Sequence, residues 1–391
     1  MKFCGIISEF NPFHNGHKYI IEQAKKITGE DVVCLCSGDF VQRGLPAIQD
    51  KYTRAQNAIA NGANAVLELP TFYATTNAEN FAYGAIKILN SLGASHIAFG
   101  VKNANLELLT KIAKLKVENS ERFQTAFKNE IENGINFNTA LKRSIAKNLC
   151  DENVLEVLND PNNVLAIEYL TAMIKTNSKM KPVAIERVDN GYFSNEPSQN
   201  FLSASGIREL IFSGQNFSDY VPKNAKMVNF FDKNYIKTLN CLQILKIKQS
   251  SPENLNALYD YNEGIEYRIK KAVQEKESID EIVDFIASPR YRKPRVNKLL
   301  LYPILNITKT AVALSKTTKP YAKVLAISKS NKDLLLTSKS KINLIVTNKD
   351  YELLNKNQNA LVKLDLNASM IYNTVFDNQK IDDMKKGTMF L

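Results

Sequence analysis

Two histidines three positions apart, His14 and His17, flank Gly16 near the start of the chain. An apolar run at Lys2–Ser8 predicts a strand before them, and apolar residues at helical spacing over Gly16–Ile27 predict a helix after them. Backbone N–H groups at the start of a helix attract anions, and glycine lets the backbone approach a phosphate closely. These residues therefore predict a turn that binds a triphosphate and stabilises the charge that develops at the α-phosphate as pyrophosphate leaves. Two incidental loop histidines are the alternative, which is disfavoured because the whole chain contains only 3 histidines.

The first half of the chain alternates short apolar runs with helical patterns, which predicts an α/β fold with a parallel sheet covered by helices on both faces. The further strands that we expect are Asp31–Ser37, Ala65–Leu69, His96–Gly100 and Pro182–Glu186. The further helices that we expect here are Lys51–Asn61, Ala78–Leu92, a helix that starts at Asp160 and runs through Ile174, and Ser203–Phe212. Glycines that follow helical patterns, where a left-handed residue can end a helix, are Gly29, Gly62 and Gly93.

The strand-helix alternation fades beyond about residue 216. We therefore divide the chain into a strand-helix domain at residues 1–215 and a mainly helical, basic domain at residues 216–391. The helices expected in the second part are Tyr235–Ile247, Gly264–Lys276, Ile279–Ala287 and Pro294–Leu305, followed by a mixed segment at Lys323–Leu366.

The charge balance favours a polyanionic partner, since 51 Lys and Arg against 40 Asp and Glu give a net charge of +11. A general bias toward Lys would give the same excess, so the distribution of the charge has to decide. The segment PRYRKPRVNK carries a basic cluster without an acid, made of Arg290, Arg292, Lys293, Arg295 and Lys298. Phosphates favour such a cluster, and Tyr291 within it suits stacking on an unpaired base. A solvated helix start is the alternative interpretation.

The remaining composition argues against a membrane protein and a structural metal site. No window approaches the roughly 18 consecutive apolar residues of a membrane span, and the N-terminal run turns acidic at Glu9, unlike a signal peptide. The 5 cysteines are scattered and form no CxxC pair. Reduced cysteines in a cytoplasmic protein fit this pattern best.

The stretch Glu9–His17, EFNPFHNGH, resembles the HIGH motif of nucleotidyltransferases and class I aminoacyl-tRNA synthetases. More narrowly, it resembles the start of the bacterial tRNA(Met) cytidine acetate ligases. Further blocks resemble that family in the same order, and they are Gly38–Ala47, Asn64–Pro70, His96–Gly100, Pro161–Tyr169 and Ser203–Arg208. Because the order and spacing agree over nearly the full chain, the set is more specific than any single block.

The resemblance implies a Rossmann-like HIGH-type nucleotidyltransferase domain that binds ATP, followed by a mainly helical domain that binds tRNA. The implied enzyme is a ligase that joins acetate and ATP into acetyl-adenylate and passes the acetyl group to N4 of the wobble cytidine of elongator tRNA(Met). Acetate, ATP and elongator tRNA(Met) are therefore the expected partners, with Mg²⁺ beside ATP and no membrane. The scheme suits the residues, because a carboxylate does not react with an amine until it becomes a mixed anhydride.

The resemblance also implies roles for single residues. The expected catalytic residues, which would contact the phosphates, are His14, His17 and Arg208. The expected ATP-binding residues are Ile7, Ser8, Glu9, Phe10, Asn11, Pro12, Phe13, His14, Asn15, Gly16, His17, Lys18, Tyr19, Ile20, Gly100, Asn162, Arg187 and Ser203. No protein metal ligand is expected. An ordinary helix N-cap is the alternative role of Ser203, and Asn163 is either a neighbour of the nucleotide or a helix cap.

The block Gly38–Ala47 leaves several roles open. Asp39 either orients the acetyl acceptor or a water, or forms a structural salt bridge. It stands where the family usually has Asn, so it either faces away from ATP or is tolerated with magnesium nearby. Arg43, Lys51 and Arg54 either hold phosphate or RNA or form structural salt bridges.

Two other functions compete with the tRNA ligase. One is a small-molecule adenylyltransferase that acts on a mononucleotide or a phosphopantetheine-like substrate, but such proteins need little more than the nucleotide-binding domain. The other is a non-catalytic RNA-binding protein with a degenerate nucleotide fold, against which the intact His14, Gly16, His17 and Arg208 argue.

Overall fold

A single central sheet organises the computed structural model of this chain, which describes residues 2–102, 105–133, 135, 137–151, 153–187, 201–335, 341–376 and 381–391. Its strands are β1 (Phe3–Ser8), β2 (Asp31–Ser37), β5 (Ala65–Leu69), β6 (His96–Val101), β7 (Lys181–Glu186), β8 (Tyr321–Ile327), β9 (Asn343–Ile345) and β10 (Met389–Phe390). The strand order is β10-β8-β5-β2-β1-β6-β7, with β9 paired to β8. A separate two-stranded hairpin consists of β3 (Phe40–Val41) and β4 (Leu45–Pro46).

The predicted α/β fold is confirmed, with one correction to the sheet. The predicted bounds of β2 and β5 are those of the structure, and those of β1, β6 and β7 differ by one residue. The sheet is not wholly parallel, because β8 pairs antiparallel with β5, while the other neighbouring strands of the sheet run parallel. The carboxyl ends of β1, β2, β6 and β7 consequently meet at one edge, where ligands of open α/β sheets bind.

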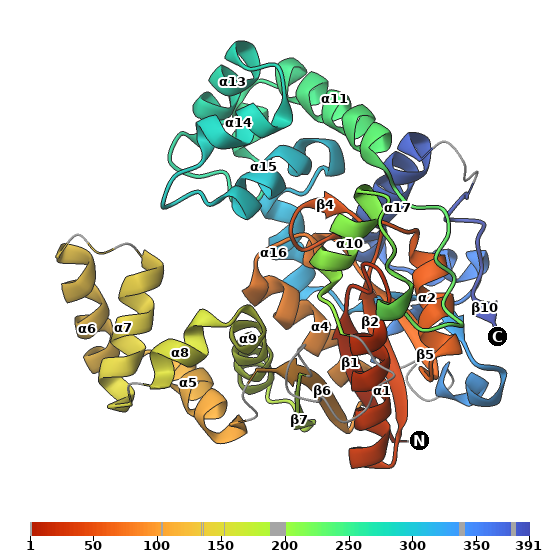
Figure 1. The fold of residues 1–391 in the computed structure, drawn as a ribbon. Helices are drawn as coiled ribbons and strands as arrows, with labels where there is room; N and C mark the ends of the chain where they lie inside the picture. The colour runs from red at the N-terminus through yellow and green to blue at the C-terminus, as the bar shows by residue number, and fades with distance from the viewer. Residues whose placement is uncertain are drawn as a thin grey trace.

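Helices cover the sheet and extend beyond it (Figure 1). Those of the first half are α1 (Asn15–Thr28), α2 (Lys51–Ala60), α3 (Thr71–Ala74), α4 (Ala78–Leu92), α5 (Leu106–Glu118), α6 (Glu121–Glu132), α7 (Phe137–Leu149), α8 (Asn153–Asn159), α9 (Pro161–Lys175) and α10 (Ala204–Phe212). Those of the second half are α11 (Lys233–Gln249), α12 (Pro252–Asn256), α13 (Ile265–Glu275), α14 (Ile279–Ile286), α15 (Lys293–Leu305), α16 (Lys309–Thr317) and α17 (Lys356–Val375). The predicted helices lie within two residues of these bounds.

Local signals explain where several helices begin and end. Gly29 and Gly93 take left-handed conformations (φ 69° and 86°) directly after α1 and α4, as predicted. Asp50 caps α2 and Asp160 caps α9, each accepting hydrogen bonds from two backbone N–H groups of the first turn.

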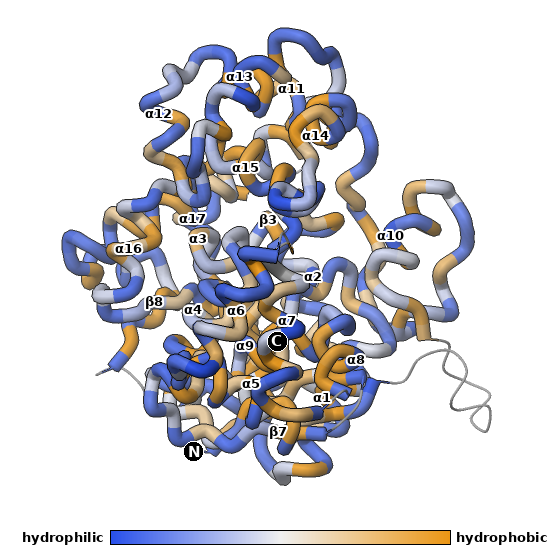
Figure 2. Tube along the Cα trace, turned by 90° about the vertical axis from the view of Figure 1, so that its left-hand side faces the viewer, coloured by the Kyte–Doolittle hydropathy of each residue, from blue (hydrophilic) through white to orange (hydrophobic). Residues whose placement is uncertain are grey.

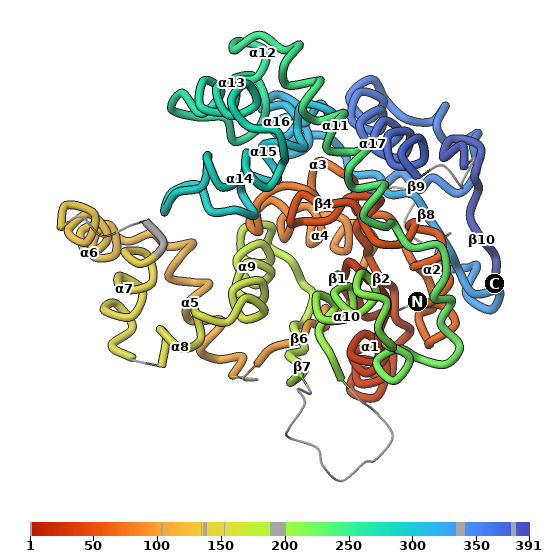
Figure 3. The backbone as a smooth tube through the Cα atoms, turned by 45° about the horizontal axis from the view of Figure 1, so that its top comes forward, coloured from red at the N-terminus to blue at the C-terminus, as the bar shows by residue number. Residues whose placement is uncertain are grey.

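The last part of the chain returns to the sheet that the first part begins. Helices α11, α13, α14 and α15 lie together on one side of the molecule, whereas α5 to α8 project on another (Figures 1 and 3). Strands β8 and β10 then join the edge beside β5. The division near residue 216 stays a prediction, but segments on both sides of it share one sheet.

Apolar and polar residues alternate along the helices (Figure 2). Within the described part of the chain, no helix combines the length and the apolar composition that crossing a membrane requires.

Candidate active site

The two histidines of the N-terminal motif form the first turn of α1. His14 is the N-cap residue, and its Nδ1 accepts a hydrogen bond from the backbone N–H of Gly16 at 3.0 Å. The Nδ1 of His17 accepts one from the backbone N–H of His14 at 3.3 Å. The two rings stack with their centroids 3.8 Å apart. This reciprocal capping box fixes both rings on the helix N-terminus.

These hydrogen bonds determine which ring nitrogen carries the proton. A neutral imidazole has one N–H, and since Nδ1 accepts in both rings, the N–H is on Nε2. Burial, followed by the charges of Arg187 and Arg208, lowers the pKa of His14 to about 3. Burial, followed by His14 and Arg187, lowers the pKa of His17 well below its usual value. Both histidines are therefore neutral donors at pH 7, each with Nε2–H to offer to an oxygen atom.

Close packing holds the turn in place. A Cβ atom at Gly16 would lie 2.8 Å from Cε1 of His14, so a larger residue would displace that ring. Phe10 meets the ring of His17 edge-on at 4.9 Å, and the ring centroid of Phe13 lies 5.6 Å from that of His17. Position 16 therefore needs glycine, because the ring of His14 leaves no room for a Cβ atom.

Arg187, Asn162 and Gly100 come together at the carboxyl ends of β6 and β7. Arg187 donates from Nη1 to Oδ1 of Asn162 at 2.7 Å. A Cβ at Gly100 would lie 3.1 Å from Cγ of Arg187, so glycine lets the arginine side chain cross the strand end. Neighbouring Asn163 is not a helix cap, because Asp160 caps α9, and the Oδ1 of Asn163 instead accepts from the backbone N–H of Lys102 at 3.0 Å.

Helix α10 approaches the histidine turn from a distant part of the sequence and lies near α1 and β1 (Figure 3). Ser203 is its N-cap residue and accepts from the backbone N–H of Gly206 at 3.2 Å. Arg208 donates from Nη1 to the backbone carbonyl of Asn11 at 2.7 Å, which attaches α10 to the loop before the histidines. Ser203 can therefore both cap α10 and take part in nucleotide binding, since a helix start with a serine cap also presents backbone N–H groups to an anion.

One cavity of about 610 Å³ receives most of these side chains. The predicted ATP-binding and catalytic residues that line it are Ile7, Ser8, Glu9, Phe10, Asn11, His14, Gly16, His17, Tyr19, Ile20, Gly100, Asn162, Arg187, Ser203 and Arg208. Four predicted residues, Pro12, Phe13, Asn15 and Lys18, do not line it. The volume is in the range of small-molecule and cofactor sites.

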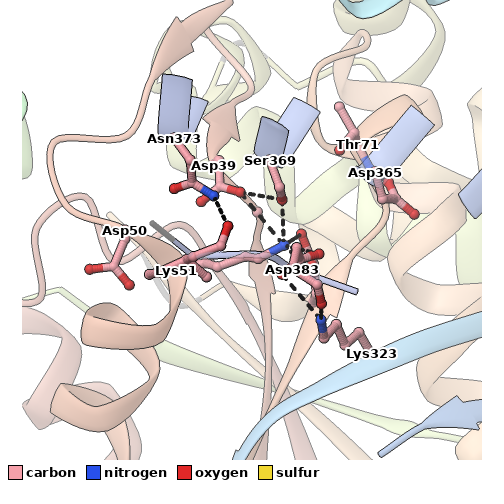
Figure 4. A network of polar contacts seen from close by, with 12 residues as sticks. Asp39, Asp50, Lys51, Thr71, Lys323, Asp365, Ser369, Asn373 and Asp383 are labelled. Atoms are coloured by element: carbon pink, nitrogen blue, oxygen red, sulfur yellow. Dashed lines mark hydrogen bonds and ion pairs between the residues drawn. The ribbon is translucent and has the colours of Figure 1, made fainter. Parts of the chain in front are cut away.

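Lys51 and Asp39 lie in a buried ion cluster rather than at this cavity (Figure 4). Lys51 Nζ lies 2.8 Å from both carboxylate oxygens of Glu68 and donates to Oγ of Ser369 at 2.8 Å. Asp39 Oδ2 accepts from the same serine hydroxyl at 2.6 Å. Asp39 therefore faces away from the nucleotide cavity, and of the two roles left open for Lys51 the structural salt bridge is the one observed.

Arg54 is also structural. It is fully buried, and its guanidinium donates to the backbone carbonyls of Glu9 at 2.6 Å, Ser37 at 2.9 Å and Gln49 at 2.9 Å. It thereby holds together the ends of β1 and β2, and it has no surface to offer to RNA. Arg43, by contrast, is exposed and lines the cavity.

Most cations of the basic segment around α15 form ion pairs with acids of this chain, which its sequence does not indicate. Arg295 binds Asp260 through two hydrogen bonds of 2.6 and 2.7 Å and lies over the ring of Tyr291 at 4.3 Å. The ring of Tyr291 is buried, so the expected stacking of this tyrosine on a base is wrong. Arg290 pairs with Glu263 and Lys293 with Asp284. Arg292 is exposed.

Sequence reasoning missed the far wall of the cavity. Helices α11 and α15 contribute Asn240, Gln243 and Asn297, and Ile279 at the start of α14 adds an apolar contact. No motif marks these residues, because they come from helices that follow the histidine turn by more than two hundred positions. Asn240 and Gln243 at i and i+3 on a helix were the available signal.

The comparisons with known proteins agree with this geometry. A family model of HIGH nucleotidyl transferases matches residues 1–387. The tRNA(Met) cytidine acetate ligase of Clostridium perfringens is 33% identical over 98% of this chain and 97% of its own length. That of a Thermoanaerobacter species is 35% identical over 97% of both. The solved structure of Thermotoga maritima TmcAL bound with alpha-thio ATP has a TM-score of 0.89 at 24% identity, with 100% of both chains covered. This chain belongs to the tRNA(Met) cytidine acetate ligase family of HIGH nucleotidyl transferases.

Proposed function

We propose that this protein is an ATP-dependent ligase that activates acetate as acetyl-adenylate and transfers the acetyl group to N4 of the wobble cytidine of elongator tRNA(Met). The observation that carries the proposal is the pair of neutral histidines on the N-terminus of α1, in one cavity with Arg187 and Arg208. The full-length similarity to relatives of that name supports the tRNA substrate. We also propose the cytoplasm as its location, since the tRNA substrate is found there.

In the first half-reaction an acetate oxygen attacks the α-phosphorus of ATP, and the bond to the bridging oxygen of pyrophosphate breaks. The Nε2–H groups of His14 and His17 would donate to phosphate oxygens on which negative charge grows. Arg187 and Arg208 supply fixed positive charge at the same cavity. Because the histidine rings and Arg208 are held by hydrogen bonds to the backbone, little reorganisation is needed at the moment of reaction.

Magnesium suits this cavity as a partner of the nucleotide. Among the described lining residues, Glu9 carries the one carboxylate, and its Oε1 accepts from the backbone N–H of Gln42 at 2.8 Å. Mg²⁺ is commonly held by substrate phosphates with one or two carboxylates and water. When bound, it would neutralise phosphate charge.

In the second half-reaction the N4 amino group of the cytidine attacks the acetyl carbonyl carbon. The bond from that carbon to the phosphate oxygen breaks, AMP leaves with the electron pair, and N4 loses one proton. The energy of the mixed anhydride drives this step, so the enzyme has chiefly to bring the base to the adenylate.

The decisive experiment combines the protein with ATP, labelled acetate and unmodified elongator tRNA(Met), then digests the RNA and measures N4-acetylcytidine. Label in N4-acetylcytidine is the expected result. Turnover of a mononucleotide or phosphopantetheine-like substrate without acetylated RNA would establish the small-molecule adenylyltransferase instead. Binding of tRNA without any ATP turnover would establish a non-catalytic RNA-binding protein.

A variant tests the phosphate assignment separately. His17→Ala is expected to lower acetyl-adenylate formation about 100-fold or more, the loss typical of removing one preorganised donor, and to leave tRNA affinity unchanged. Lys26→Ala, an exposed residue in the last turn of the same helix, is the matched control. Equal activity of His17→Ala and Lys26→Ala would refute the phosphate site.

A further inference from the structure

The far wall of the cavity contains polar side chains that the first half-reaction does not use. Gln243 is 5% exposed, yet its side-chain amide has no hydrogen-bond partner in the part of the chain that the structure describes. Neither amide atom of Gln243 is fully buried, so the small accessible surface of this side chain includes both atoms. Since Gln243 lines the cavity, this surface faces the cavity. The amide is therefore free to form hydrogen bonds with water or with a ligand in the cavity.

Two more amides face the same space. Asn240 lies one helical turn before Gln243 on the same face of α11, and Asn297 comes from α15. Within the described residues, neither side chain has a hydrogen-bond partner. Three amides without a protein partner among the described residues, from two helices that pack against each other, therefore line the same cavity.

The surroundings of these amides are apolar. Ile236, Leu239, Ile279 and Leu300 line the cavity around them. A flat ring with polar atoms on one edge and apolar faces fits such walls, as extruded bases fit the pockets of base-modifying enzymes.

Charge distinguishes this end of the cavity from the end that holds the histidines. A carboxylate or a triphosphate favours cations, and Arg187 and Arg208 lie among the histidine-side residues. Neutral amides instead complement a neutral partner that has both donors and acceptors. The Watson–Crick edge of cytosine has the N4 amino donor and the N3 and O2 acceptors, which amide groups can match.

The β3–β4 hairpin connects the two ends. Gly44 in the hairpin has φ 74°, and a Cβ there would lie 2.7 Å from the backbone nitrogen of Lys298, so the hairpin packs directly on α15. Arg43 in the same hairpin is exposed and lines the cavity. A cation at this place suits a backbone phosphate of an RNA whose base enters between α11 and α15.

We propose that Asn240, Gln243 and Asn297 form the pocket for the acceptor cytosine and hold its Watson–Crick edge beside the adenylate. This assignment rests on the proposed function and adds the residues that select the base. They are positioning residues for N4, and acetate activation does not depend on them.

The test separates the two half-reactions. Gln243→Leu is expected to lower kcat/KM for tRNA acetylation about 10- to 100-fold, the range of one base-reading side chain. Acetate-dependent exchange of pyrophosphate into ATP, measured without tRNA, is expected to stay at the wild-type rate. Because leucine replaces an unpaired buried amide, the unfolding free energy should be equal or higher, which checks that the variant folds. Gln249→Leu, an exposed amide on the same helix, is the matched control and should keep both activities.

The outcomes separate this pocket from the ligase activity itself. If Gln243→Leu acetylates tRNA at the wild-type kcat/KM, the assignment of the cytosine pocket is wrong, while the proposed ligase function is unaffected. An equal loss of exchange and acetylation would also overturn it, because the amides would then serve the adenylate. Absence of N4-acetylcytidine with the wild-type protein would overturn the proposed function and the pocket together. A tRNA with uridine at the wobble position gives a further check, since Gln243→Leu should narrow the difference in affinity between the two tRNAs, and an unchanged difference would count against base reading.

Discussion

Replacing Lys51 with methionine should destabilise the fold without affecting nucleotide binding directly. Lys51 is 1% exposed, and its Nζ lies 2.8 Å from Glu68 Oε1, 3.0 Å from Asp383 Oδ2 and 3.6 Å from Asp39 Oδ2. Methionine keeps most of the apolar stem but removes the charge. Three carboxylates would then be left in the interior, and among the described residues Lys323 pairs with one of them, Asp383 (Figure 4).

The size of the effect follows from this geometry. Removing one partner of a buried ion pair costs about 3–5 kcal/mol, because the other charge stays buried and uncompensated. Burial and the neighbouring carboxylates raise the pKa of Glu68 to about 8, against the opposing effect of Lys51. Below about pH 8 the folded protein already holds a proton on Glu68 that the unfolded chain releases, and without Lys51 it would hold that proton to higher pH. Stability of the variant should therefore fall as the pH rises, with the smaller deficit near pH 6 and the larger near pH 9.

Urea unfolding followed by circular dichroism at pH 6 and pH 9 measures both quantities. Lys111→Met is the matched control, since Lys111 pairs with Glu107 on the surface, where an ion pair contributes little to stability. Adding Glu68→Gln to Lys51→Met should restore about 1–3 kcal/mol, because it removes one stranded carboxylate. A loss below about 1 kcal/mol for Lys51→Met, or wild-type stability with weakened tRNA binding, would refute the structural role.

The active site gives two further predictions, and the basic segment around α15 gives a third. Lowered pKa values of His14 (about 3) and His17 mean that the unfolded chain binds protons below pH 6.5 that the folded chain does not, so stability should fall with decreasing pH by about 1.4 kcal/mol per unit for each histidine. Urea unfolding between pH 7 and pH 5 measures this slope, and a flat profile would contradict the neutral assignment. Gly16→Ala should lower acetate-dependent pyrophosphate exchange at least about tenfold, because the new Cβ displaces the His14 ring, and normal exchange would count against that contact. Arg292→Ala should weaken tRNA binding and reduce its salt slope by about one unit, whereas Arg295→Ala should lower the unfolding free energy. Salt titrations of tRNA affinity distinguish the two arginines, and equal slopes would argue against this division.

The strand-helix part of the fold was predictable because its signals are local. The bounds of β2, β5 and α4 follow from apolar periodicity and from turn residues such as Gly93. The return of β8 to the sheet was not predictable from the sequence. Its partner β5 lies more than 250 positions earlier, and no local pattern specifies a pairing across that distance. The antiparallel direction of β8 has the same cause.

The ion pairs of charged residues were also not predictable, because their partners are remote in the sequence. Lys51 and Arg54 look like surface cations in the sequence, but their partners come from other elements. The acids that pair with the basic segment around α15 likewise lie elsewhere in the sequence, at Asp260, Glu263 and Asp284. Spacing along the chain therefore located the histidine turn, whose partners are adjacent, and failed where partners are remote.

Burial keeps the two histidines neutral, and the charges that suit the site to ATP add to this effect. Arg187 and Arg208 lower the pKa of His14, and Arg187 adds to the lowering at His17. A triphosphate brings negative charge to the same place, so its binding should offset the arginines and raise both histidine pKa values again. The hydrogen bonds from Nε2–H then strengthen as charge grows on the phosphate oxygens. The arrangement therefore stabilises the transition state of adenylate formation more than it stabilises bound ATP.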